Sequence, residues 1–289
     1  MKKALAIDIG GTKIYHTIID ENGDIVGKIE KHSTPKNFEA LKKILTDAIE
    51  KHEDEIDAIA IATAGAVNNE NSRVISSTGN LVEGYNQLDF QALSKKKVFV
   101  ENDANSAAWA EYVLGASKCC PSSVMITLGT GVGGGIILNN KLFKGKSGGA
   151  GEMHFKMYPD KRRKCTCGTW DCFEAYASGT GLKLTAEEML NNKDVTTYDV
   201  INGVKDGCPD MKAVFDTWQN HILAGLIGLA NLFDPDCIVL SGSMAEFVDT
   251  DFLETGVNAE IVTAPLKVHK ATTGNYAGMV GVSLLALRD

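Results

Sequence analysis

The sequence predicts an α/β protein made of two halves that each begin with a similar hairpin. The first such run covers residues 4–20 and the second covers residues 124–138. Each starts as an apolar β run, passes through glycines and a threonine, and continues as a second apolar run that meets a turn. Helical patterns follow both hairpins, so we expect each hairpin to open its own α/β half.

The two glycine turns predict an anion site. They read Gly10-Gly11-Thr12 and Gly129-Thr130-Gly131. Glycines let backbone N–H groups approach an anion with no side chain in between, and the threonine hydroxyl adds a donor. One such turn is weak evidence, but two such turns indicate a polyphosphate bound between the two halves.

The rest of the first half alternates buried strands with helices. Pro35 and Asn37 introduce a helix, because the apolar residues that follow them recur at helical spacing. Short apolar runs indicate the strands, and an alanine-rich run indicates the second helix. The expected elements are a strand at 25–30, a helix from about 38, strands at 58–62 and 98–100, and a helix at 104–113.

The second half carries its helices after the hairpin. The longest is expected at about 213–233, with Trp218 and Leu226 on one apolar face, and Asp234-Pro235 ends it. The other expected elements are a helix at 173–190, a buried strand at 237–240 that ends at Ser241-Gly242-Ser243, and a small-residue helix at 276–287.

Composition excludes some classes of function. The 289 residues are 44% hydrophobic and 23% charged, as in ordinary soluble globular proteins. The formal net charge of −8 disfavours binding to nucleic acid or to acidic membranes. No run approaches the roughly 18 apolar residues of a membrane helix. Seven cysteines without a secretion signal indicate reduced thiols and a cytoplasmic location.

Two acidic positions at strand ends are candidates for chemistry. Asn102-Asp103 lies between a strand and a helix, where ligand sites of α/β sheets concentrate. There an aspartate can accept the proton of an attacking hydroxyl while the asparagine holds a second hydroxyl. The alternative is that either residue only caps the helix. Asp8 adjoins the first glycine turn and would suit a bridging Mg²⁺, or it only initiates the turn.

A histidine and three cysteines predict a structural zinc site. His154, Cys165, Cys167 and Cys172 match a closed tetrahedral donor set. Buried free thiols are the alternative. The metal would stiffen a loop carrying Glu152 and Glu174, whose carboxylates could then accept hydrogen bonds from a polyhydroxy ligand.

Together these motifs resemble those of ROK-family sugar kinases, which have the two-domain actin-like (ribonuclease H-like, hexokinase-like) ATPase fold. The resemblance runs over essentially the whole chain. The matching segments are residues 8–12 and 128–134 for phosphate, 101–105 for catalysis, 150–152 with 165–174 for sugar and zinc, and 234–243 for adenosine.

The resemblance implies that the γ-phosphate of Mg·ATP is transferred to a hexose or N-acetylhexosamine hydroxyl, with Asp103 as the general base. Glucose or N-acetylmannosamine and the 6-OH are favoured. The implied sugar contacts are Gly65, Asn80, Asn102, Asp103, Glu152, His154 and Glu174. The implied nucleotide contacts are Asp8, Gly10, Gly11, Thr12, Thr127, Gly129, Thr130 and Gly131 at the phosphates, with Gly242 and Ser243 at the adenosine.

The resemblance also implies a domain division and a homodimer. A small domain would hold residues 1–119 and the C-terminal helix 276–289, and a large domain, residues 120–275, would hold the zinc loop and the dimer surface. The alternative function is that of a sugar-sensing, non-catalytic ROK regulator without a DNA-binding domain. The intact Asp103 and both glycine turns argue against it.

Two segments depart from the family pattern. His154 follows Glu152 by two residues instead of three, so either His154 still reaches the zinc or Phe155 takes the place of the histidine. The segment 77–85 lacks the prolines and the tryptophan usual in relatives, where it contacts the sugar. For this reason the identity of the sugar does not follow from the resemblance.

Overall fold

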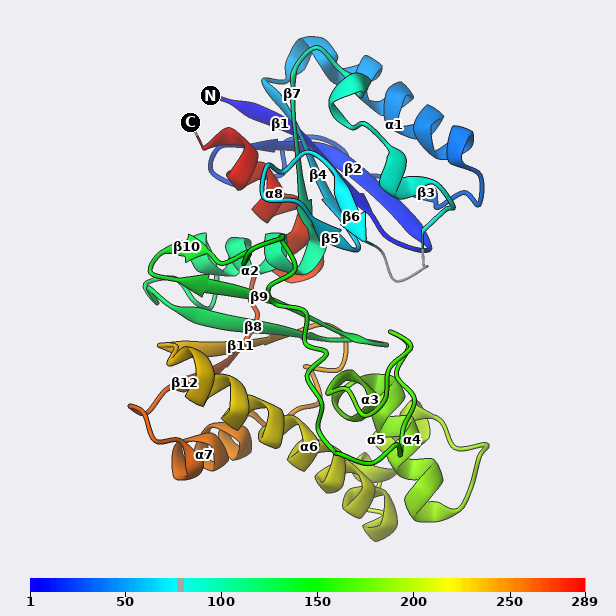
Figure 1. Ribbon diagram of the computed structural model, residues 1–289, viewed down its shortest axis with the longest axis vertical. Helices are drawn as coiled ribbons and strands as arrows, with labels where there is room; N and C mark the ends of the chain where they lie inside the picture. The colour runs from blue at the N-terminus through cyan, green and yellow to red at the C-terminus, as the bar shows by residue number, and fades with distance from the viewer. Residues whose placement is uncertain (77–80, 289) are drawn as a thin grey trace.

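The computed structural model, which describes residues 1–76 and 81–288, contains two five-stranded sheets of the same design (Figure 1). Their strand orders are β3-β2-β1-β4-β7 and β10-β9-β8-β11-β12. In each, the first three strands pair antiparallel and the last three pair parallel. The predicted α/β class and the paired hairpins are therefore confirmed.

The first sheet alternates large and small apolar residues on its two faces. Its strands are β1 (Lys3–Ile9), β2 (Lys13–Asp20), β3 (Glu30–Ser33), β4 (Ala58–Thr63) and β7 (Lys97–Asn102). Isoleucines such as Ile7 and Ile59 pack under helix α1 (Phe38–His52). Alanines such as Ala4 and Ala60 form the other face, beneath helix α8 (Ala277–Leu287). Strand alternation thus places a helix on each face.

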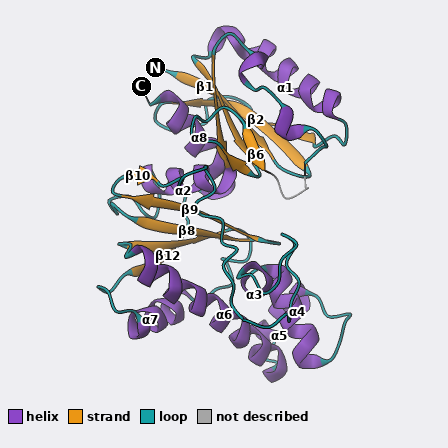
Figure 2. Ribbon diagram, viewed as in Figure 1, coloured by secondary structure: helices purple, strands orange, loops and turns teal. Residues whose placement is uncertain are grey.

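The second sheet buries its main core under a layer of helices, visible in Figures 1 and 2. Its strands are β8 (Ser123–Leu128), β9 (Val132–Leu138), β10 (Lys141–Leu142), β11 (Cys237–Ser241) and β12 (Lys267–Lys270). The helices are α3 (Glu174–Ala177), α4 (Gly179–Leu190), α5 (Thr197–Lys205), α6 (Pro209–Phe233) and α7 (Thr250–Glu260). The fully buried Trp218 of α6 donates to the carbonyls of Ala177 and Ser178, which ties α6 to the start of α4.

Helices α2 (Asp103–Val113) and α8 lie between the two sheets. They approach so closely that a Cβ on Gly281 would stand 1.7 Å from the Ser106 carbonyl oxygen. Residues of both sheets and both helices share one core cluster, which includes Ala6 of β1 and Val239 of β11. The two halves are thereby packed against each other through a pair of helices.

Two sequence expectations were wrong in detail. The strand expected at 25–30 is displaced, because the N–H groups of Val26 and Gly27 both bond to the Ile18 carbonyl and bend the chain before β3 begins at Glu30. The helix expected at 173–190 is two helices. Ser178 ends α3 in an extended conformation, and its side chain then caps α4 by accepting from the Gly181 N–H.

Other elements carried weaker sequence signals. Helices α5 and α7 and strand β12 were not predicted, and α6 begins at Pro209, four residues before its expected start. Strands β5 (Ala66–Val67) and β6 (Val74–Ser76) form a small separate hairpin beside the first sheet. No helix within residues 1–76 and 81–288 has the length and apolar character needed to cross a bilayer.

Candidate active site

A cavity of about 630 Å³ lies where the strand ends of the two sheets face each other. Its walls come from both halves of the chain. Among the residues expected from the sequence, those that line it are Asp8, Gly65, Asn102, Asp103, Thr127, Gly129, Thr130, Gly131, Glu152, His154, Glu174 and Gly242. Residues far apart in the chain therefore meet at one site.

Asn102 and Asp103 occupy the junction of β7 and α2. Asn102 caps the helix, because its Oδ1 accepts from the Asn105 N–H at 3.0 Å. Asn102 therefore has the capping role that the sequence offered as an alternative to ligand binding. Its Nδ2 donates to the Gly65 carbonyl at 3.1 Å. Asp103 is the first helical residue, and its Oδ1 accepts from the Ala104 N–H at 2.8 Å. The Asp103 side chain lines the cavity.

Two carboxylates of the cavity influence each other. Burial is the main cause that raises the pKa of Asp8 to about 7, and the negative charge of Asp103 adds to it. Enclosure between the halves raises the pKa of Asp103 too, with a contribution from Glu152. The Asp103 side chain remains open to the water of the cavity, so we expect this rise to be largest when a ligand displaces that water.

The second glycine turn, between β8 and β9, is built into the cavity wall. Thr127 Oγ1 accepts from the Gly133 N–H at 3.0 Å, and the Gly129 N–H bonds to the Gly131 carbonyl at 3.0 Å. A Cβ on Gly131 would stand 2.5 Å from Glu174 Oε2. This position therefore requires glycine, because a side chain would displace the carboxylate.

The first glycine turn is placed differently. Gly10, Gly11 and Thr12 do not line the cavity, although Asp8 at the end of the same strand does. The turn is clamped by Thr34, whose hydroxyl donates to the Gly10 carbonyl at 2.6 Å and whose N–H bonds to the Thr12 carbonyl at 3.0 Å. The turn thus stands at the outer edge of the site, with Thr12 exposed.

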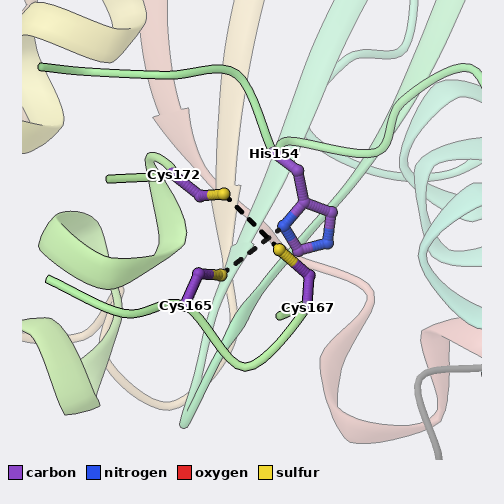
Figure 3. A group of neighbouring side chains, drawn as sticks. All are labelled: His154, Cys165, Cys167 and Cys172. Carbon is purple, nitrogen blue, oxygen red and sulfur yellow. Dashed lines mark hydrogen bonds between the residues drawn. The ribbon is translucent and has the colours of Figure 1, made fainter. Parts of the chain in front are cut away.

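The histidine and the three cysteines come together in one cluster (Figure 3). One ligand atom from each lies within 4.8 Å of all the others. His154 Nδ1 is 3.9 Å from Cys165 Sγ, and Cys167 Sγ is 3.5 Å from Cys172 Sγ. Around a tetrahedral zinc ion, neighbouring donor atoms are roughly 3.5–3.8 Å apart, so this donor set fits the metal.

The shortened spacing after Glu152 still brings His154 to the cluster. Phe155 does not take its place, because its ring stacks on Phe173 with centroids 4.9 Å apart. The second ring nitrogen of His154, Nε2, lies 3.4 Å from Glu152 Oε2. That carboxylate raises the pKa of His154. His154 therefore connects the cysteine cluster to a carboxylate of the cavity.

Glu174 connects the same cluster to the second glycine turn. Its Oε2 accepts from the Val132 N–H at 3.0 Å, and its Oε1 accepts from the Thr166 hydroxyl and from the Cys165 thiol. The side chain is almost completely buried but still lines the cavity. One carboxylate thus fixes the position of residues 165–174 relative to the turn after β8.

A family model described as the ROK family matches residues 4–289. The chain belongs to the ROK family. A glucokinase of Streptomyces coelicolor is 36% identical over an alignment of 313 positions, gaps included, that covers 99% of this chain and 98% of that protein. An N-acetylmannosamine kinase of Salmonella typhimurium is 31% identical over an alignment of 297 positions, gaps included, that covers 99% of this chain and 98% of that protein.

A solved structure of a ROK family glucokinase from Streptomyces griseus, in complex with glucose and AMPPNP, superposes with a TM-score of 0.79. It is 29% identical and covers 99% of this chain and 100% of its own. The similarity confirms the predicted actin-like, two-domain ATPase fold.

The remaining expected positions of this ROK chain lie at the rim or outside the described residues. Gly242 has a positive φ of 87°, and a Cβ there would stand 2.4 Å from the Leu128 carbonyl oxygen, so the turn after β11 packs on the end of β8. Ser243 is exposed beside it and does not line the cavity. Asn80 lies outside the residues that the structure describes.

Several other cavity residues were not predicted as site residues, among them Asn105, Thr166, Thr180 and Gly278. Thr166 lies between two cysteines of the cluster, and Thr180 Oγ1 donates to the Thr130 carbonyl at 2.8 Å. Only their position beside known motifs could have indicated them, because a lone threonine or glycine carries no chemical pattern.

Proposed function

We propose that the protein is an ATP-dependent hexose kinase that transfers the γ-phosphate of ATP to a sugar hydroxyl. The observation that carries this proposal is the position of Asp103, whose carboxylate faces the same cavity as the glycine turn after β8. A base and a phosphate-binding turn on opposite walls are what an in-line transfer to a hydroxyl needs. Membership of the ROK family and the relatives described above support it.

Asp103 accepts the proton of the attacking hydroxyl as the new O–P bond forms. The bond from the γ-phosphorus to the bridging oxygen breaks, and ADP leaves with that oxygen. The backbone N–H groups of Thr130 and Gly131 would face the phosphate chain and stabilise its charge, since that of Gly129 is bonded to the Gly131 carbonyl. Asn102, fixed by its bonds to Asn105 and Gly65, keeps the start of α2 and hence Asp103 in place.

Mg²⁺ would be held near Asp8 and would neutralise charge on the phosphates when bound. The carboxylate and the adjoining turn are the hard oxygen donors and anion-binding amides that such a complex requires. We further propose that Gly10, Gly11 and Thr12 reach the phosphates when the two halves close on the ligands, and that Gly242 and Ser243 lie against the adenosine.

The sugar would lie between Asp103 and the loop that carries Glu152 and His154. Glu152 is exposed to the cavity and can accept hydrogen bonds from two hydroxyls. Gly65 and Glu174 border the same space, although both oxygens of Glu174 already accept protein hydrogen bonds. Glucose and N-acetylmannosamine, phosphorylated at the 6-OH, are the first candidates because the two relatives are named for them.

We also propose that His154, Cys165, Cys167 and Cys172 bind a structural zinc ion. With four protein donors the metal would leave no position for substrate, so it would act by stiffening the loop. Through His154 the loop orients Glu152, and through the Thr166 hydroxyl, which donates to Oε1 of Glu174, it orients Glu174. The zinc would therefore serve sugar binding without taking part in the transfer.

Three organisational features complete the proposal. The small domain would hold residues 1–119 and 276–289, and the large domain residues 120–275. The protein would be a homodimer that pairs through the large domain, where Leu232 and Val262 are largely exposed. It would act in the cytoplasm, in keeping with seven free thiols.

A coupled assay of ADP release over a panel of hexoses tests the function. We expect ATP turnover that depends on one hexose, with glucose and N-acetylmannosamine tested first. Tight binding of a sugar with no turnover would favour the alternative of a non-catalytic ROK regulator. ATP hydrolysis that no sugar changes would contradict both.

A further inference from the structure

A second cluster of metal-ligating side chains lies outside the cavity lining, on the face of the first sheet that α1 covers. It consists of His16 on β2, Glu30 on β3 and His52 at the end of α1. One ligand atom from each lies within 4.8 Å of the other two. His16 pairs directly with Glu30 in the antiparallel register, so the sheet itself brings two of the three together.

A third histidine is hydrogen-bonded to the cluster. His32, also on β3, places its Nε2 3.2 Å from Nε2 of His16, with the two rings stacked. Glu30 Oε2 lies 3.9 Å from the same nitrogen of His16.

Unsatisfied polar atoms point to a missing ligand. Nδ1 of His16 and Nδ1 of His52 are buried and have no hydrogen-bond partner among the described residues. His16 is only 2% exposed, so water does not replace that partner. A buried ring nitrogen without a partner is costly, and a bound cation could satisfy Nδ1 of His52. Nδ1 of His16 would stay unpaired, because Nε2 is the nitrogen of that ring that faces Glu30 Oε2.

One positive charge adjoins the cluster. Lys51, next to His52, donates to Oε1 of Glu30. Oε2 of Glu30 is the oxygen that faces His16, so the lysine does not occupy the ligand position. Lys51 is mostly exposed and can turn away, because exposed ion pairs contribute little energy.

We propose that His16, Glu30 and His52 bind one divalent transition-metal ion such as Zn²⁺. Two imidazoles and a carboxylate are a donor set that zinc accepts, and three protein ligands leave a position for water. The ion would join β2, β3 and α1. Strand β3 leads at once to Thr34, which clamps the first glycine turn, so the ion would also steady that turn.

Counting zinc in the full-length protein tests the proposal. Wild-type protein and the variant His52→Gln are dialysed against buffered Zn²⁺, and bound zinc is counted by native mass spectrometry. We expect the wild type to hold one zinc more than the variant, whatever the occupancy of the Cys165 cluster, because the test rests on a difference. His269→Gln, in β12 of the other sheet, is the matched control and should keep the wild-type count.

Cobalt distinguishes the two sites by their colour. Thiolate ligands give Co²⁺ an intense near-ultraviolet absorption, whereas the histidine and carboxylate site adds only weak visible bands. These weak bands should disappear in His52→Gln and in Glu30→Gln, while the thiolate absorption stays unchanged. Loss of a direct ligand should weaken binding by more than the roughly 10–100-fold seen when an outer partner is removed.

Equal zinc counts in the wild type and in His52→Gln would overturn the proposal. So would loss of zinc in the His269→Gln control. In either case the cluster would be a set of hydrogen-bonded histidines that hold no metal. His52 is half-exposed at a helix end, so His52→Gln should leave the fold intact, which far-ultraviolet circular dichroism checks.

Discussion

Lys144 and Glu101 form an ion pair that joins the two halves of the molecule beside the cavity, with Nζ and Oε2 2.8 Å apart. Glu101 directly precedes Asn102-Asp103 and is completely buried. Its carboxylate also accepts from the side chains of Asn71 and Asn105. Lys144, from the segment after β10, also donates to the Asn68 carbonyl.

Lys144→Met should destabilise the protein and weaken its activity. Removal of one partner of a buried pair costs about 3–5 kcal/mol when the other charge is left unpaired. Here Glu101 keeps its amide donors, so we expect about 1–3 kcal/mol. Urea unfolding measures this loss. Lys141→Met, an exposed residue of the same hairpin, is the control and should change stability by less than about 0.5 kcal/mol.

Asp103→Asn should lower kcat by about 100-fold to 10,000-fold and leave sugar binding nearly unchanged. The asparagine keeps the shape of the side chain and its bond from the Ala104 N–H, but it cannot accept the proton of the hydroxyl. Steady-state kinetics and sugar titration by calorimetry separate the two effects. Turnover close to that of the wild type would contradict the role of Asp103 as base.

The pKa of Asp8 predicts how stability depends on pH. Its pKa rises from 3.8 unfolded to about 7 folded, so the folded state holds the proton more tightly. Ionised Asp8 therefore lowers the free energy of unfolding. This destabilisation grows from about pH 4 to about pH 7 and is constant above pH 7. At pH 8, in protein free of Mg²⁺ and nucleotide, the free energy of unfolding of Asp8→Asn should exceed that of the wild type by about 1–2 kcal/mol. Urea unfolding measures this difference.

At pH 5 the two proteins should be closer in stability, because Asp8 is then mostly protonated in the folded state. The same titration should produce an acid limb in the activity, with kcat/KM falling below about pH 7 as Asp8 takes up its proton. A stability difference that does not change between pH 5 and pH 8 would exclude Asp8 as its source.

Gly131→Ala should impair the site, because the new Cβ would stand 2.5 Å from Glu174 Oε2. The carboxylate would have to leave the Val132 N–H, which would disturb both the turn and the loop 165–174. We expect a rise of at least about tenfold in the KM for ATP, equal to about 1.4 kcal/mol. Gly228→Ala is the matched control, since nothing lies within 4 Å of its Cβ and alanine favours helices.

Zinc removal should loosen the loop between Glu152 and Glu174. Chelation would leave three thiols and His154 without a common partner, and metal binding contributes directly to local folding. We expect the KM for the sugar to rise more than the KM for ATP, with recovery on adding zinc. Cys167→Ser should reproduce the effect. Full activity in protein shown to be free of zinc would remove the structural role.

Much of the site was readable in the sequence because each motif fixes its own local geometry. The strand end before Asp103 and the spacing of the three cysteines are short-range patterns. The contacts between motifs are not short-range patterns, so they could not be predicted from the sequence. That Glu174 would bond to Val132, 42 residues away, depends on how α3 docks against β9. The break at Ser178, by contrast, has a local signal, because serine favours the N-cap and Gly179 and Gly181 disfavour a continuous helix.

The position of α8 has a consequence for how the protein is made. One face of the first sheet consists of alanines from β1 and β4, and the helix that covers them is formed by residues 277–287. On the ribosome, the strands that are synthesised first therefore keep an apolar face uncovered until translation is almost finished. A stop codon that removes α8 would damage the half of the molecule encoded at the opposite end of the gene.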